Sequence, residues 1–297
     1  MPDLESVYSA TADTARILGA RCDRDALWPI LRAYEAGFTG GAVALRTTTR
    51  ARRGGELSVR YIGPAGDPDP YRVALDQGFT VEADRPAGRL YREIQDRGGV
   101  GFRGVDVGVA SGFEKIWSIY AEEGGKTLEA MSRTPAMPPS VGGNLDYFAR
   151  HGLTSINGIA VDYRSHSVNV YFPFTGARDA QKISTMIEDL GFRVPGDDEL
   201  DLCCRAFSVY FTFTWNSPDI ERICFPVRAP EPDLVPAHLD PLIGRFVRGA
   251  RFHDGDRAYV YALAFSGHGP YYKIENFYHR PAPMIESDRL RTPLPPR

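Results

Sequence analysis

The chain has 297 residues, of which 43% are apolar and 25% charged, and these values exclude a disordered or collagen-like chain. Thirty-five basic and 38 acidic residues give a net charge of −3, so no overall basic field would attract nucleic acid. No apolar run has the length of a membrane span, and the acidic N-terminus does not resemble a secretion signal. The four cysteines, two of them adjacent, do not form a disulfide framework, so we expect a cytoplasmic protein.

Helical and β-rich segments alternate along the chain. Two helices, near residues 3–18 and 24–36, come before a first hairpin with strands 41–49 and 56–62. Asp69 and Pro70 supply an N-cap and a first-turn proline for a helix over 71–77. The segments that follow are helix 87–97, strands 102–111 and 114–121, helices 126–133 and 141–151, strands 154–164 and 167–174, helix 177–190, strands 207–215 and 219–227, and strands 258–266 and 271–279.

The hairpins begin about 50 residues apart, which indicates a repeated supersecondary unit. The predicted fold class is α/β (α+β): a ten-stranded antiparallel β-barrel of about five ααββ repeats, with the helices outside and a ligand-binding lumen inside. No low-complexity linker divides the chain, so we expect one domain over 1–297, with a frayed tail at 292–297. Closure leaves no sheet edge that demands a partner, which favours a monomer.

Each second strand of the five hairpins carries one polar residue on the face opposite its apolar side chains, because successive side chains alternate across a strand. If the apolar faces pack under the helices, these residues point into the lumen: Arg60, Lys115, Asn169, Arg222 and Lys273. Four cations in one cavity are costly without a counter-ion, and a diphosphate would provide one. The alternative is that each residue lies on a solvated face, as exposed charges usually do.

Two other motifs have simpler readings. Asp197-Asp-Glu-Leu-Asp201 spells the DDxxD diphosphate motif of helical isoprenyl synthases, but it occurs once, so we expect Asp197 or Asp198 to cap a short helix. Gly99-Val-Gly-Phe-Arg-Gly104 matches GxGxxG but follows a helix and enters a strand, so it is read as a turn.

Short stretches from the first hairpin to the last resemble the ABBA-type aromatic prenyltransferases of bacterial secondary metabolism. They are the strand bearing Arg60, Ser111-Gly-Phe-Glu-Lys-Ile-Trp117, Pro135-Ala-Met-Pro-Pro-Ser140, Val161-Asp-Tyr163, Val168-Asn-Val-Tyr-Phe172, Phe207-Ser-Val-Tyr210, Ile220-Glu-Arg-Ile-Cys-Phe225 and Tyr271-Tyr-Lys273. The resemblance implies transfer of a prenyl group from an allylic diphosphate to an electron-rich aromatic ring. It also implies a ten-stranded antiparallel barrel ringed by helices.

The resemblance further implies roles for individual residues. Lys115, Asn169, Arg222 and Lys273 would hold the diphosphate, and the aromatic rings of Trp117, Tyr171 and Tyr210 would shield the allylic cation from water. Trp117 stands where some relatives have tyrosine. Glu275 is the candidate base that removes a proton from the prenylated ring; its alternative is a structural ion pair with Lys273 or Arg222. Acceptor contacts would come from Asn157, Ser208 and Phe277.

One position departs from the magnesium-dependent members of that family. Ser58 stands where they have an aspartate, and serine is a poor magnesium ligand beside a carboxylate. Arg60, on the same face of the strand, could supply the missing positive charge. We therefore expect catalysis without a metal or other cofactor, although Asp106 on the neighbouring strand could support a weak magnesium site.

The bulk of Trp117 favours dimethylallyl diphosphate over the longer geranyl diphosphate as donor, with a hydroxybenzoate, hydroxynaphthalene, quinone or dihydrophenazine as acceptor. The alternatives are the same reaction with geranyl diphosphate and a non-catalytic barrel that carries an anionic amphiphile. A carrier would need neither Glu275 nor the aromatic wall.

Overall fold

A computed structural model describes residues 1–50, 56–66, 68–80, 85–121, 126–174, 179–253 and 257–282. Its α-helices are α1 (Leu4–Leu18), α2 (Arg24–Ala33), α3 (Glu35–Gly40), α4 (Pro70–Asp76), α5 (Pro86–Asp96), α6 (Leu128–Ser132), α7 (Pro139–Gly143), α8 (Leu145–Arg150), α9 (Ala180–Glu188), α10 (Asp197–Cys204) and α11 (Pro241–Gly249). A 3-10 turn, η2, covers Pro232–Leu234.

Ten antiparallel strands close into a barrel in the order β1-β12-β11-β10-β9-β8-β7-β4-β3-β2. Their bounds are β1 (Ala42–Thr48), β2 (Leu57–Pro64), β3 (Val100–Gly108), β4 (Gly112–Tyr120), β7 (Gly158–Asp162), β8 (Ser167–Pro173), β9 (Ser208–Thr214), β10 (Arg222–Ala229), β11 (Tyr259–Ser266) and β12 (Tyr271–His279). A separate pair, β5 (Lys126–Thr127) and β6 (Ser155–Ile156), lies outside the closed sheet. The predicted fold class is confirmed.

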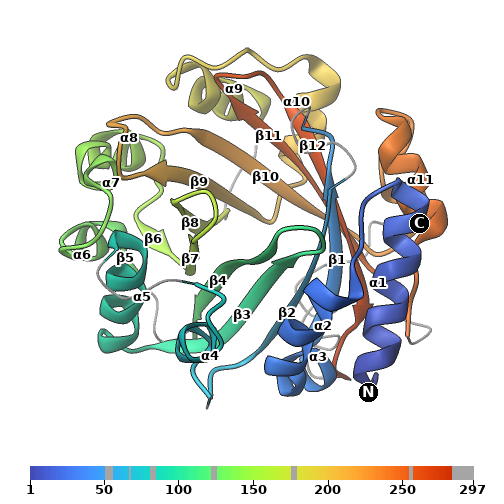
Figure 1. Cartoon of the computed structure of the whole chain (residues 1–297). Coiled ribbons are helices and arrows are strands. Elements are labelled where there is room, and N and C mark those ends of the chain that lie inside the picture. Colours follow the sequence, from blue (N-terminus) through green and yellow to red (C-terminus); the bar gives the residue numbers. More distant parts are fainter. Residues whose placement is uncertain are drawn as a thin grey trace.

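The helices lie around the outside of the barrel, and α1 and α11 pack against each other on one flank (Figure 1). The helix ends follow their sequence signals. Asp69 accepts hydrogen bonds from the backbone N–H groups of Tyr71 and Arg72 at 2.9 and 3.0 Å, and Pro70 occupies the first turn of α4. Both parts of that prediction are confirmed.

The alternation of side chains across each strand separates a core from a lumen. Outward side chains pack under the helices in the large hydrophobic core, among them Val43, Val59, Ile116, Val170, Phe211, Phe225 and Leu263. Phe148 of α8 is an example of this packing of helix on sheet: its ring centre lies 5.2 Å from that of Phe172 and 4.9 Å from that of Phe211. A second, smaller cluster lies inside the barrel, formed by Tyr210, Cys224, Ala262, Ala264 and Tyr271 with Tyr171 beside it.

The repeats are less regular than the sequence predicts. The expected helix 126–133 begins as strand β5 before α6, and 141–151 is divided between α7 and α8. Helix α10 was expected only as a short helix at the acidic run, α11 was not predicted, and the fifth unit has η2 and α11 in place of two helices. The acidic run does open a short helix, but the cap is Gly196, whose N–H donates to Glu199 at 3.0 Å; Asp197 and Asp198 follow in the first turn. The tail at 292–297 lies outside the described residues.

Within the described ranges, no helix combines the length and the apolar character needed to cross a bilayer.

Candidate functional site

Most of the residues predicted for the site lie along the inner face of the barrel. Along β10 the inner face carries Arg222, Cys224, Pro226 and Arg228 in turn. Strand β9 pairs with it in register, Thr212 opposite Arg222 and Tyr210 opposite Cys224. The end of this wall that carries Arg222 is called the cationic end below. Aromatic rings follow it, and Arg228 lies toward the other end.

The cationic end holds three of the residues predicted to bind the diphosphate, Arg222, Asn169 and Lys273. Arg222 Nη1 donates to the hydroxyl of Tyr271 at 2.8 Å, and Arg222 Nη2 donates to Asn169 Oδ1 at 3.3 Å. Lys273 donates from its ammonium to the hydroxyl of Tyr210. Lys115 lies on the opposite wall, where its Nζ is 3.3 Å from Asp162 Oδ2.

The charges of the lumen do not balance within this end. Arg46, Arg60 and Lys115 each pair with a carboxylate, whereas Arg222 and Lys273 have none within 4.0 Å among the residues that the structure describes. The Nε atom of Arg222 is also buried without a hydrogen-bond partner. Two neighbouring cations are thus left with neutral partners, which is an arrangement suited to an added polyanion.

The pKa shifts reflect the same imbalance. Burial, followed by the charge of Arg222, lowers the pKa of Lys273 well below its ordinary 10.5. Burial also lowers the pKa of Lys115, although Asp162 opposes this effect. For Asp162 itself, burial is the largest effect and would raise the pKa, but the charge of Lys115 and the hydrogen bonds from Ser165 and Lys115 together outweigh it and the pKa is lowered. An anion at this end would favour the charged forms of both lysines.

Three aromatic side chains form a continuous wall next to the cations. The ring of Tyr171 lies 4.8 Å from that of Trp117 and 4.7 Å from that of Tyr210. Cations flank this wall, with Lys273 Nζ 5.0 Å from the Tyr210 ring centre and Arg60 Cζ 4.9 Å from that of Trp117. The wall therefore offers π faces that interact with positive charge.

A network of two arginines and two carboxylates lies beside Trp117. Arg60 contacts Glu275 directly through Nη2 and Oε2, and its Nη1 is 3.9 Å from Asp106 Oδ1. Arg46 Nη2 is 3.2 Å from Asp106 Oδ2. The alternative expected for Glu275 named the wrong partner, because its ion pair is formed with Arg60 across the β1–β2–β12 seam rather than with Lys273 or Arg222.

The surroundings of Ser58 bear on whether the site needs a metal. Ser58 pairs in register with Arg46, whose guanidinium lies 3.2 Å from Asp106 Oδ2. The only carboxylate that the sequence offered there, Asp106, already contacts Arg46 and also accepts a hydrogen bond from Trp117 Nε1 at 2.9 Å. Across the described ranges, no group of three or more His, Cys, Asp and Glu side chains could hold a metal ion. Catalysis without a metal stays a prediction.

The residues expected at the acceptor end are less closely grouped. Ser208 is buried on the inner face of β9, and its hydroxyl donates to the carbonyl of Phe172 at 2.8 Å. Phe277 is on the inner face of β12 opposite Ala44 of β1. Asn157 is exposed between β6 and β7, and it reaches the wall through its backbone N–H, which donates to the carbonyl of Tyr171 at 3.0 Å.

Sequence reasoning missed four inner residues: Arg46, Asp162, Thr212 and Tyr271. Three of them lie on first strands of hairpins, whereas the alternation of side chains was followed along second strands only. The signal was present, since Arg46 alternates with Ala44 and Asp162 with Ala160 in the same way. Tyr271 precedes Lys273 by two positions and shares its face.

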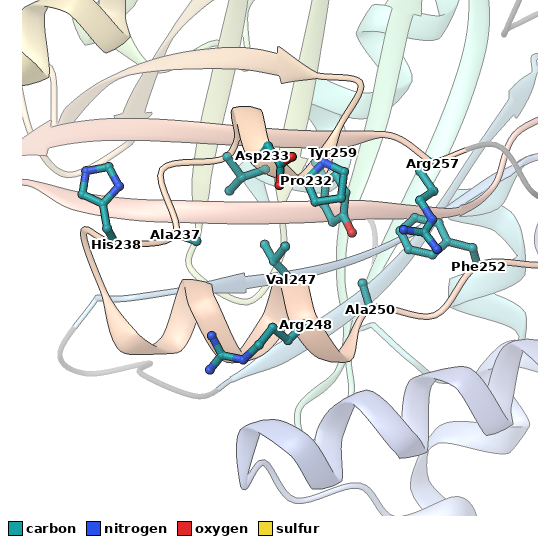
Figure 2. Close-up of a pocket in the computed structure, with 11 residues that line it drawn as sticks. Pro232, Asp233, Ala237, His238, Val247, Arg248, Ala250, Phe252, Arg257 and Tyr259 are labelled. Carbon is teal, nitrogen blue, oxygen red and sulfur yellow. The ribbon is translucent and has the colours of Figure 1, made fainter.

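A cavity of about 570 Å³ lies elsewhere, outside the barrel wall (Figure 2). It is bounded by η2, α11 and the start of β11, with Val235, Val247, Phe252 and Tyr259 among its lining residues. None of the inner-face cations or carboxylates lines it, so it is separate from the site described above.

Comparison with known proteins places this arrangement in context. The family described as aromatic prenyltransferase Orf2 matches residues 2–286. The chain is 35% identical to flaviolin linalyltransferase of Streptomyces virginiae over 93% of its own length and 92% of that protein. It is 33% identical to 5,10-dihydrophenazine-1-carboxylate 9-dimethylallyltransferase of Streptomyces anulatus, covering 93% of each chain. It is 34% identical to a furaquinocin biosynthesis prenyltransferase of Streptomyces sp. (strain KO-3988), over 93% of this chain and 90% of the relative.

Proposed function

The chain belongs to the aromatic prenyltransferase Orf2 family, and we propose that it transfers a dimethylallyl group from dimethylallyl diphosphate to an electron-rich aromatic acceptor without an essential metal. It is thus an enzyme that prenylates aromatic compounds of secondary metabolism. The donor, the acceptor class, the residue roles and the metal independence are the parts that we propose.

The uncompensated pair of Arg222 and Lys273 carries the proposal for the donor site. A diphosphate held there, with Asn169 and Lys115 nearby, would supply the missing negative charge. When the allylic C–O bond breaks, its electron pair leaves with the diphosphate, and fixed cations stabilise that growing charge. The same cations would be costly in a barrel that bound only neutral ligands.

The aromatic wall supports the second part of the reaction. The allylic cation left by ionisation needs π faces and exclusion of water, which Trp117, Tyr171 and Tyr210 can provide. The names of two relatives mention different prenyl groups, linalyl and dimethylallyl. We favour the shorter group because the indole of Trp117 and the adjoining Tyr171 ring occupy part of the inner wall.

The acceptor ring would bind beyond this wall, toward Ser208 and Phe277. Its carbon attacks the allylic cation, forming a new C–C bond, and the ring then loses a proton to recover aromaticity. Glu275 is our candidate to accept that proton. It is 4% exposed, faces the lumen, and its carboxylate contacts the Arg60 guanidinium. Acceptors of hydroxybenzoate, hydroxynaphthalene, quinone or dihydrophenazine type fit such chemistry.

The contacts made by residues of the first hairpin support metal independence. Arg46 stands beside Ser58, and the Asp106 carboxylate is engaged by Arg46 and Trp117. A guanidinium on this wall could neutralise charge that a divalent ion would otherwise neutralise.

The test is incubation of the full chain with dimethylallyl diphosphate and a panel of the four acceptor types, with and without excess EDTA. Pyrophosphate release and prenylated product are measured together. We expect product in EDTA at the rate seen without it, and a faster reaction with dimethylallyl than with geranyl diphosphate. The Arg222→Ala variant serves as the inactive control, and Lys182→Ala, on α9 outside the barrel, as the matched surface control.

Each result separates the parts of the proposal. Product that EDTA abolishes would refute metal independence alone. A preference for geranyl diphosphate would refute the donor assignment. Binding of the diphosphate without turnover across the whole panel would favour the carrier.

A further inference from the structure

A buried carboxylate is bonded to the aromatic wall itself. Asp106 is 0% exposed, and its Oδ1 accepts the hydrogen bond of the Trp117 indole N–H at 2.9 Å. We infer that Asp106 is a positioning residue of the prenyl transfer: it fixes the orientation of the Trp117 indole and increases the electron density of the ring, so that the ring stabilises the allylic cation more strongly. This inference rests on the proposed role of Trp117 as a wall of the cation site.

The geometry leaves the indole one orientation. Its N–H edge is held by Asp106, and one side of the ring meets Tyr171 at 4.8 Å. Rotating the ring about its side-chain bonds would break the hydrogen bond. A carboxylate oxygen would then be buried without that donor, which is unfavourable in free energy. The wall therefore stays in position while the substrate reacts.

The electrostatics explain why a carboxylate is needed. Arg60 Cζ and Lys115 Nζ already lie 4.9 and 6.0 Å from the Trp117 ring centre, and these cations compete with an allylic cation for the same π density. An ionised acceptor at the indole N–H polarises the ring in the opposite direction, because a charge-assisted hydrogen bond draws the proton and leaves electron density on the ring.

The other roles for Asp106 explain less. It is not needed to neutralise Arg60, which has Glu275. Asp106 Oδ1 accepts the indole hydrogen bond, whereas Oδ2 lies 3.2 Å from Arg46 Nη2 and is buried without a hydrogen-bond partner. Asp162 is the matched comparison, since it is also a buried lumen carboxylate paired with a cation, but its partner is Lys115 and not the indole.

The decisive experiment is a double-mutant cycle on single-turnover rates. Asp106→Asn keeps the size of the side chain and one oxygen but removes the charge, and Trp117→Phe keeps a π face but removes the N–H. We expect Asp106→Asn to slow turnover roughly 10- to 100-fold in the wild-type background, the range for a lost charge-assisted contact. In the Trp117→Phe background the same change should cost at most a few-fold. Asp162→Asn should cost the same in both backgrounds.

A spectroscopic measurement tests the contact without relying on activity. The chain has three tryptophans, and the Trp215 indole donates to a neutral carbonyl, that of Ala136, at 2.8 Å. In ¹H–¹⁵N spectra the Trp117 indole proton, assigned through Trp117→Phe, should resonate downfield of the Trp215 proton. It should move upfield in Asp106→Asn while the Trp215 signal stays in place.

Two results would overturn the inference: an equal cost of Asp106→Asn in both backgrounds, or a Trp117 proton upfield of that of Trp215 in the wild type. The second result remains decisive even if Asp106→Asn does not fold. A wild type that is inactive with every donor and acceptor would overturn the proposed function instead, and the spectra would still test the Asp106–Trp117 contact.

Discussion

Replacing Lys273 with methionine should stabilise the empty protein while weakening its binding of the prenyl diphosphate. The ammonium lies inside the barrel without a carboxylate partner in the described part of the chain, beside the guanidinium of Arg222. Lys273 Nζ and Arg222 Cζ are 5.0 and 5.9 Å from the Tyr210 ring centre, so the two charges are at most about 11 Å apart. At roughly 10 Å and an effective dielectric constant of about 20, two unit charges repel by about 1.7 kcal/mol.

Two opposing contributions determine the expected change in stability of the empty protein. Removing the ammonium relieves this repulsion and the cost of burying the charge, but it deprives the Tyr210 hydroxyl of a donor, which costs about 1 kcal/mol. The net gain for the empty protein is therefore on the order of 1 kcal/mol, or roughly 2–4 °C in Tm for a chain of this size. Truncating a buried charged contact to the ligand should weaken donor binding by about 2–5 kcal/mol.

The stability difference should also depend on pH. The pKa of Lys273 is lowered in the folded protein, so between that lowered pKa and the ordinary value of 10.5 the unfolded chain binds more protons. Stability of the wild type then rises with pH across this interval. The advantage of Lys273→Met should be largest below the interval and shrink as the pH increases through it.

The assay is thermal unfolding of the wild type, Lys273→Met and the surface control Lys182→Met, each alone and with a non-hydrolysable thiolo analogue of dimethylallyl diphosphate, at several pH values. We expect a higher Tm for empty Lys273→Met and a smaller increase on adding the analogue. Two results would refute the reasoning: a lower Tm for the empty variant, or an increase in Tm on adding the analogue that equals that of the wild type. Either would show that the Lys273 ammonium is not an uncompensated charge that binds the diphosphate.

Three further predictions follow from contacts described above. Arg222→Ala removes donors to Tyr271 and Asn169 and should weaken donor binding by about 2–5 kcal/mol, measured by calorimetry; unchanged affinity would place the diphosphate elsewhere. Glu275→Gln should lower turnover with little change in donor affinity, and equal turnover in a stopped-flow assay would remove Glu275 from the role of base. Phe211→Ala, in the outer core against Phe148, should cost about 3–5 kcal/mol of unfolding free energy in urea without altering donor affinity per folded molecule, and a loss under 1 kcal/mol would contradict the packing described.

Much of the fold could be predicted because the strands carry a strong alternation. Val168-Asn-Val-Tyr-Phe172 shows it plainly: Val168, Val170 and Phe172 pack outward, while Asn169 and Tyr171 face the lumen. Helix α11 was missed although Asp240 and Pro241 supply an N-cap and a first-turn proline, as Asp69 and Pro70 do for α4. Helix α10, expected only as a short helix without bounds, has a weaker signal. Helix α10 opens with three acidic residues and buries little more than Leu202 and Cys203. Its apolar periodicity is therefore too weak to predict its bounds, and tertiary contacts stabilise it.

The site could be predicted as a set of residues but not as a set of pairs. Alternation identifies the inner face, so Arg60, Lys115, Arg222 and Lys273 were found from spacing alone. Which acid each cation meets depends on the register between strands far apart in the chain. Arg60 meets Glu275 because β1 pairs with both β2 and β12. The single domain, the monomeric state and the cytoplasmic location remain predictions.

The seam between β1 and β12 has a consequence for synthesis. Strand β12 is made last, yet it joins β1, and the register runs from Val43 with His279 to Thr48 with Lys273. While a ribosome is still translating the final hairpin, β1 and β11 both expose unpaired backbone groups, and such edges invite aggregation of nascent chains. Because the same late strand delivers Lys273 and Glu275, a truncated polypeptide would lack both its last wall and two of its polar lumen residues.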